Sequence, residues 1–130
     1  MNTKTHFRPV GLREAELILA ADCKAFPPRL PTQPIFYPVL NFAYAEQIAR
    51  DWNTRDKLSG YAGFVTRFAV ARPYVDQFDE HQVGASKHRE LWVPAEELDA
   101  FNRHIIGQIE FVAAFYGDDF SGERLTFLSL

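Results

Sequence analysis

Apolar residues recur at two different spacings along this chain, and the spacing predicts the type of each element. Spacings of three and four residues predict amphipathic helices over residues 12–22 and 42–52, and a third helix begins near Pro94 and ends near Arg103. Alternation and β-branched or aromatic runs predict strands at 6–10, 35–37, 64–70, 82–83, 90–93 and 105–115. Because helices interrupt the strands without a regular βαβ alternation, we expect an α+β fold with a mixed or antiparallel sheet and about three helices.

Prolines, glycines and capping residues mark the boundaries of these elements. Four prolines between positions 27 and 34 fix φ and remove amide donors, so residues 25–33 are expected to form an irregular, stiff loop. Asn41 stands where an N-cap is needed for the second helix. Gly84 opens a turn that separates two short strands and predicts a hairpin or a looped strand pair.

Length and composition narrow the class of protein. A chain of 130 residues predicts one domain, 1–130, with a core large enough to need no disulfide or structural metal. The net charge of −3, with both signs interspersed, does not indicate a nucleic-acid partner. No apolar run approaches the roughly 18 residues of a membrane span, so no membrane partner is expected. The single cysteine, Cys23, excludes an intramolecular disulfide and favours a reducing, cytoplasmic location.

Common catalytic and metal-binding motifs are absent from the sequence. There is no phosphate-binding loop ending in Lys-Ser/Thr, no G-x-G-x-x-G after a strand, no H-E-x-x-H and no G-x-S-x-G. The four histidines show no short metal-ligand spacing, so we predict no metal site.

Four segments carry a resemblance to a known family: FRPVG (7–11), FPPRL (26–30), IFYPVLN (35–41) and HRELWVP (88–94). Over about residues 7–109 the chain resembles small bacterial proteins that carry the label ADP-ribosylation/crystallin J1. The label points to ADP-ribosylglycohydrolases, which are longer, mainly helical enzymes with acidic residues around two metal ions. Because this chain is shorter, richer in strands and without an acidic metal motif, we do not expect hydrolase activity.

The order of elements is more similar to the compact fold of ADP-ribosyltransferases. In that fold an Arg or His on the first strand, a Ser or Tyr on a middle strand and a Glu on a late strand surround NAD. The resemblance implies that Arg8, Tyr37 and Glu90 take these three places. Arg8 would bind the pyrophosphate or a ribose, Tyr37 would stack on nicotinamide, and Glu90 would stabilise the oxocarbenium charge. Arg29, held between prolines, is a further candidate for ligand binding.

Each candidate also has a structural interpretation. Arg8 can lie over Phe7 or pair with a helix carboxylate, Tyr37 can be an aromatic residue at the edge of the core, and Glu90 can belong to a solvated strand face. Arg29 can anchor its loop. Trp92 shares the strand face of Glu90, so that face is not plainly polar.

Two functional hypotheses therefore remain. The first is an ADP-ribosyltransferase-like domain that binds NAD or an ADP-ribose-bearing ligand and acts on a small nucleotide ligand or a protein target. The alternative is a non-enzymatic binding or oligomerisation module, favoured by the high aromatic content, the stiff loop and the apolar tail at 125–128, with a homo-oligomer as its expected form.

Overall fold

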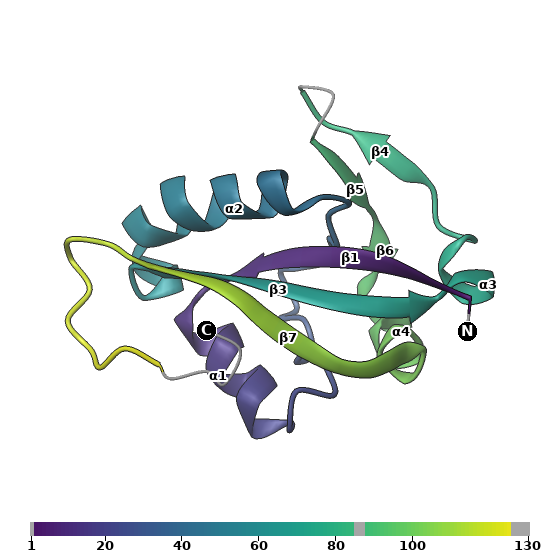
Figure 1. Ribbon diagram of the computed structural model, residues 1–130, viewed down its shortest axis with the longest axis horizontal. Coiled ribbons are helices and arrows are strands. Elements are labelled where there is room, and N and C mark those ends of the chain that lie inside the picture. Colours follow the sequence, from purple (N-terminus) through teal and green to yellow (C-terminus); the bar gives the residue numbers. More distant parts are fainter. Residues whose placement is uncertain (1, 85–87, 126–130) are drawn as a thin grey trace.

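The computed structural model describes residues 2–84 and 88–125, and it has an α+β fold with antiparallel sheets (Figure 1). The three long strands are β1 (Thr3–Val10), β3 (Ala62–Ala71) and β7 (Ile105–Tyr116), and they form an antiparallel sheet in the order β1-β3-β7. The α+β class predicted from the sequence is confirmed, and of the two pairings expected, mixed or antiparallel, the structure has the antiparallel one. β7 was the longest strand expected from period-two alternation, and it is the longest found.

Short strands extend this architecture beyond β1. β2 (Ile35–Phe36) pairs with β6 (Val93–Pro94), and β4 (Glu80–Gln82) pairs with β5 (Arg89–Leu91), as the predicted hairpin requires. Residues 85–87, which follow β4 and precede β5 in the sequence, lie outside the described residues.

Val39 joins the short strands to the long sheet. It exchanges two backbone hydrogen bonds with Phe7 of β1, at 2.7 and 2.9 Å, and forms an antiparallel bridge with Glu90 of β5 on its other side. The amide of Leu91 also donates to the carbonyl of Pro38 at 2.8 Å. The segment before α2 therefore lies between β1 and β5, and it brings three separate parts of the sequence side by side.

Two helices cover opposite faces of β3 (Figure 1). α1 (Leu12–Ala20) contributes Ala15 and Ile18 to the core cluster that holds Phe64 and Phe68 of β3. On the other face, α2 (Phe42–Asp51) buries alanines against Val65. Because successive strand residues point to opposite faces, the start of β3 is buried on both sides.

Close packing of α2 on β3 depends on a glycine. A β-carbon at Gly63 would lie 2.2 Å from the carbonyl oxygen of Ala49, which is far inside van der Waals contact. The N-terminus of α2 is capped as expected, since the Asn41 side chain accepts a 2.8 Å hydrogen bond from the amide of Tyr44.

The remaining helical segments are short. α3 (Arg72–Val75) follows β3 directly, and α4 (Leu98–Arg103) continues from a 3₁₀ turn at Ala95–Glu97. Between α2 and β3 the chain forms two further 3₁₀ turns, Asn53–Arg55 and Lys57–Ser59. Within the described part of the chain, no helix is long and apolar enough to cross a membrane.

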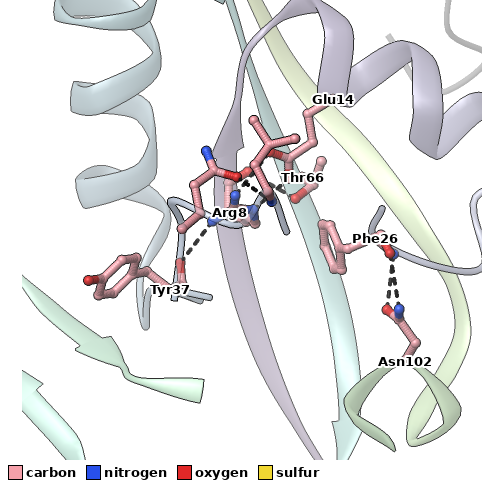
Figure 2. A network of polar contacts seen from close by, with 8 residues as sticks. Arg8, Glu14, Phe26, Tyr37, Thr66 and Asn102 are labelled. Carbon is pink, nitrogen blue, oxygen red and sulfur yellow. Dashed lines mark hydrogen bonds and ion pairs between the residues drawn. The ribbon is translucent and has the colours of Figure 1, made fainter. Parts of the chain in front are cut away.

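The proline-rich loop is irregular, as predicted, and it is tied to α4. The side-chain amide of Asn102 bonds both the backbone N–H and the carbonyl of Phe26, each at 3.0 Å (Figure 2). Phe26 itself is 2% exposed and packs on Phe36 and Phe68. Of the predicted apolar tail, Leu125 packs on the core, while residues 126–130 lie outside the described residues.

Candidate functional site

A hollow of about 470 Å³ opens beside the bridge that Val39 makes between β1 and β5. We call it the tryptophan hollow, because Trp52 and Trp92 both line it. All four residues proposed from the sequence, Arg8, Arg29, Tyr37 and Glu90, are among its lining residues. The others are Pro9, Val39, Ile48 and Val83. Segments far apart in the sequence thus converge on one site.

Arg8 lies on β1 and is almost fully committed to the protein itself (Figure 2). Its Nε and Nη2 donate to the two carboxylate oxygens of Glu14 on α1, at 2.7 and 3.0 Å, and Nη1 reaches the carbonyl of Tyr37 at 3.4 Å. The guanidinium also lies 4.7 Å from the centre of the Phe36 ring. This arrangement matches the structural interpretation in which Arg8 pairs with a helix carboxylate. The pair neutralises the charge of Arg8 and fixes one wall of the hollow.

Arg29 contrasts with Arg8 because its charge is not neutralised. Its Nε atom is buried without a hydrogen-bond partner, and across residues 2–84 and 88–125 no carboxylate forms an ion pair with it. Burial, followed by the neighbouring positive charge of Arg8, lowers the pKa of Arg29 below its usual range. A half-buried guanidinium with unused donors is suited to bind an anion that enters the hollow.

The backbone carbonyl and the aromatic ring of Tyr37 make different contacts. Its carbonyl faces the Arg8 guanidinium, whereas its ring points away from Arg8 (Figure 2). The ring is 38% exposed and meets Trp92 edge to face, with 6.5 Å between ring centres and an interplanar angle of 89°. The strand expected over 35–37 ends at Phe36, so Tyr37 lies outside β2, immediately before Pro38.

Glu90 lies on β5 and is held by aromatic neighbours. The indole Nε1–H of Trp92 donates to its carboxylate at 3.1 Å. Burial, and then the nearby negative charge of Glu90, raise the pKa of Tyr44 on α2. A glutamate on a fully solvated strand face has no comparable set of partners, so Glu90 is an oriented group that lines the hollow.

Two tryptophans complete the hollow, and the sequence had not singled them out as site residues. Trp52 continues the apolar stripe of α2, which predicts a core position, yet it is 60% exposed. Ala45 and Ala49 of that stripe are fully buried, so the larger residues Ile48 and Trp52 are left to line the hollow. Trp92 is 45% exposed and has His81 stacked on one face at 3.9 Å.

A second, smaller hollow of about 330 Å³ lies next to the first. The two share Arg8, Pro9, Arg29 and Trp52, so Arg29 can be reached from both. No group of three or more His, Cys, Asp or Glu placed to hold a metal ion occurs among the described residues. Comparisons of the chain with protein-family models, with curated proteins and with solved structures found no match.

Proposed function

We propose that this chain is an ADP-ribosyltransferase-like domain that binds NAD or an ADP-ribose-bearing ligand in the tryptophan hollow. The observation that carries the proposal is the convergence of Arg8, Arg29, Tyr37 and Glu90, from four separate segments, on one hollow. We also propose that the chain is related to the small bacterial proteins labelled ADP-ribosylation/crystallin J1, which it resembles in sequence.

The chemistry of the lining residues supports this proposal. Arg29 supplies an unpaired cation for a phosphate or pyrophosphate group. Tyr37 and Trp92 present exposed aromatic surface to a planar ring. Glu90 places a carboxylate at the same hollow, where it can accept from a ribose hydroxyl and stabilise positive charge at the anomeric carbon.

The pairing of Arg8 with Glu14 changes the role that the resemblance implies for Arg8. In the proposal, Arg29 is the main phosphate ligand, and Arg8 holds the backbone of Tyr37 and the first turn of α1 in place. Thr66 supports this arrangement from β3, because its hydroxyl donates to the carbonyl of Arg8 at 2.9 Å (Figure 2).

Ligand-dependent stability of the purified protein tests the proposal. A ligand that binds only the folded state raises its free energy of unfolding, by about 2.7 kcal/mol at about 100 times Kd, so NAD or ADP-ribose is expected to raise Tm. Arg29→Gln should abolish most of this rise, because the variant loses the charge that meets the phosphates.

Arg67→Gln is the matched control, since Arg67 pairs with Glu110 on the long sheet and does not line the hollow. It should leave the ligand-induced rise in Tm intact. An unchanged Tm of the unsubstituted protein at millimolar NAD and ADP-ribose would count decisively against the proposed function.

A second candidate function is a non-enzymatic binding or oligomerisation module, and one observation favours it. Tyr37, Trp52, Val83 and Trp92 are large apolar residues that are exposed and line the same hollow. Exposed apolar patches of this kind often contact other proteins. If the hollow is such an interface, the molar mass measured by light scattering should exceed that of the monomer, and Trp52→Ser should return it to the monomer value.

A further inference from the structure

We infer that two copies of this chain associate through the outer edge of β7, which pairs with the same strand of the second copy. The inference concerns a surface outside the tryptophan hollow and does not depend on the proposed function, because no residue of β7 lines that hollow. It gives a neighbour to a long strand that lies at the border of the sheet.

The two borders of the sheet differ in length and charge (Figure 1). With the bridge at Val39 included, the strands follow the order β4-β5-Val39-β1-β3-β7. β4 is three residues long and carries Glu80, which forms ion pairs with Lys4 and Arg89. Short length and charge keep an edge strand from pairing with other chains. β7 has twelve residues, no Lys or Pro and a single charged residue, Glu110, so it lacks this protection.

The first half of β7 is covered by the turn that follows α1. The carbonyl of Cys23 accepts a 2.7 Å hydrogen bond from the amide of Ile109, and the carbonyl of Asp22 accepts from the Gln108 side chain at 3.0 Å. Asp22 and Cys23 have φ values of 58° and 57°, in the left-handed region that residues with side chains adopt at a cost in free energy. The fold therefore closes this part of the edge with strained backbone.

The second half of β7, residues 113–116, has no such covering turn among the described residues. A bulge at Val112, which has no partner in the β3 register, separates it from the covered half. Within residues 2–84 and 88–125, β3 is the only strand that pairs with it. Its side chains are half-buried, and the backbone N–H and C=O groups that point away from β3 form an edge to which a further strand can add.

The side chains of this segment indicate what kind of strand can add. Ala113 and Phe115 pack with the cluster that α2 covers, and Ala114 and Tyr116 pack with the cluster on the α1 face. Strands with two apolar faces are typical of the interior of a sheet, where each strand has a neighbour on both sides. A strand that adds to this edge must therefore also be apolar on both faces, and β7 of a second copy meets this condition.

Antiparallel pairing of β7 with itself is also complementary in size and charge. With Ala114 on a two-fold axis, Ala113 of each copy lies opposite Phe115 of the other, so each large side chain meets a small one. The paired segment, residues 112–116, contains no charged residue, so no like charges meet at the axis. The result is a closed dimer with a continuous antiparallel sheet, and it leaves both tryptophan hollows accessible.

The dependence of molar mass on concentration tests the inference on the full chain. Because a segment this short buries little area, the dimer should be weak, with a Kd between about 1 μM and about 1 mM. Sedimentation equilibrium should show the mass rise from 14.9 kDa toward twice that value over this range. A mass that stays at the monomer value up to about 1 mM would overturn the inference.

Substitutions at the two borders of the sheet locate the interface. Ala114→Lys places two positive charges opposite each other at the axis and should weaken the dimer at least about tenfold. Gln82→Lys is the matched control, because it adds the same charge to β4, and it should leave the dimer intact. Trp52→Ser should also leave it intact, because Trp52 lines the tryptophan hollow. A dimer that survives Ala114→Lys, or one that is lost in Trp52→Ser, would overturn the inference.

Amide hydrogen exchange of the unsubstituted protein gives a measurement that does not require Ala114→Lys to fold. Amides of residues 113–116 that point away from β3 should exchange slowly at high protein concentration and faster on dilution below Kd. The Ile109 amide, which is bonded to Cys23, should not change on dilution. Slow exchange at every concentration would mean that another part of the chain, such as residues 126–130, occupies the edge. That result, or fast exchange at every concentration, would overturn the inference.

Discussion

Glu90 is the residue on which catalysis in the proposed function depends most. Glu90→Gln keeps the size of the side chain and its capacity to accept from Trp92, but it removes the negative charge. If the domain cleaves the bond between ribose and nicotinamide, turnover should fall by roughly 100- to 1000-fold, the usual effect of losing one electrostatic contact to a transition state. Release of nicotinamide from NAD measures this rate.

Folding and ADP-ribose affinity serve as controls for the same substitution. Both should stay near those of the unsubstituted protein, because Glu90 forms no ion pair with a described residue and glutamine keeps an oxygen that can accept from a ribose hydroxyl. A turnover rate equal to that of the unsubstituted protein would remove Glu90 from the mechanism.

His6 makes stability depend on pH in the mildly acidic range. It is fully buried on β1, where burial lowers its pKa from 6.5 to about 4, and its Nδ1 lies 3.2 Å from the carbonyl of Lys4. Between these two pKa values the unfolded chain binds more protons than the folded protein, so the free energy of unfolding decreases as pH falls.

The expected loss is about 2.5 kcal/mol between pH 7.5 and pH 4.5, before most carboxylates protonate. Urea unfolding at a series of pH values measures it. His6→Phe, which keeps an aromatic ring beside Phe68, should flatten the dependence over this range. A dependence of the same slope in His6→Phe would assign it to another group.

The contact between the proline-rich loop and α4 is a second determinant of stability. Asn102 satisfies both backbone groups of Phe26, and Phe26 anchors in the core the loop that carries Arg29. Asn102→Ala removes two hydrogen bonds and leaves a part-buried amide and carbonyl without their protein partner. We expect a loss of about 2 kcal/mol in the free energy of unfolding, measured by urea denaturation.

Arg29 lies three residues after Phe26 in the same loop. Asn102→Ala should therefore also weaken ligand binding, although Asn102 does not line the hollow. Asn41→Ala, which removes the cap of α2, is a comparison of similar chemistry at another element. If Asn102→Ala leaves both stability and ligand affinity unchanged, the loop is held in place by its other contacts.

Much of the architecture could be predicted from the sequence, because hydrophobic periodicity reports local structure. The helices at 12–20 and 42–51 and the strands β1, β3 and β7 each have a clear period. The bridge at Val39 could not be predicted, since it depends on which distant segments pair and no local pattern encodes that. The burial of both faces of β3 follows from the same long-range packing.

The site was predictable in part for a similar reason. Residue types and a family resemblance pointed to Arg8, Arg29, Tyr37 and Glu90, and the structure places all four around one hollow. The different roles of Arg8 and Arg29 could not be predicted from the sequence. They depend on the ion pair that Glu14 forms with Arg8 across the turn between β1 and α1. The exposure of Trp52 could not be predicted, because a helical stripe does not show where the core ends.

We propose that a nucleotide occupies the tryptophan hollow, and two tryptophans of the chain can report whether this claim is correct. Trp52 and Trp92 are its only tryptophans, and both line the hollow. In a ¹⁵N-labelled sample the two indole N–H resonances can therefore be followed while NAD is added. We expect both resonances to shift along saturable curves with a common Kd, and the Trp92 resonance to respond to the group beside Glu90. Indole resonances that stay fixed at millimolar NAD in the folded protein would contradict the claim.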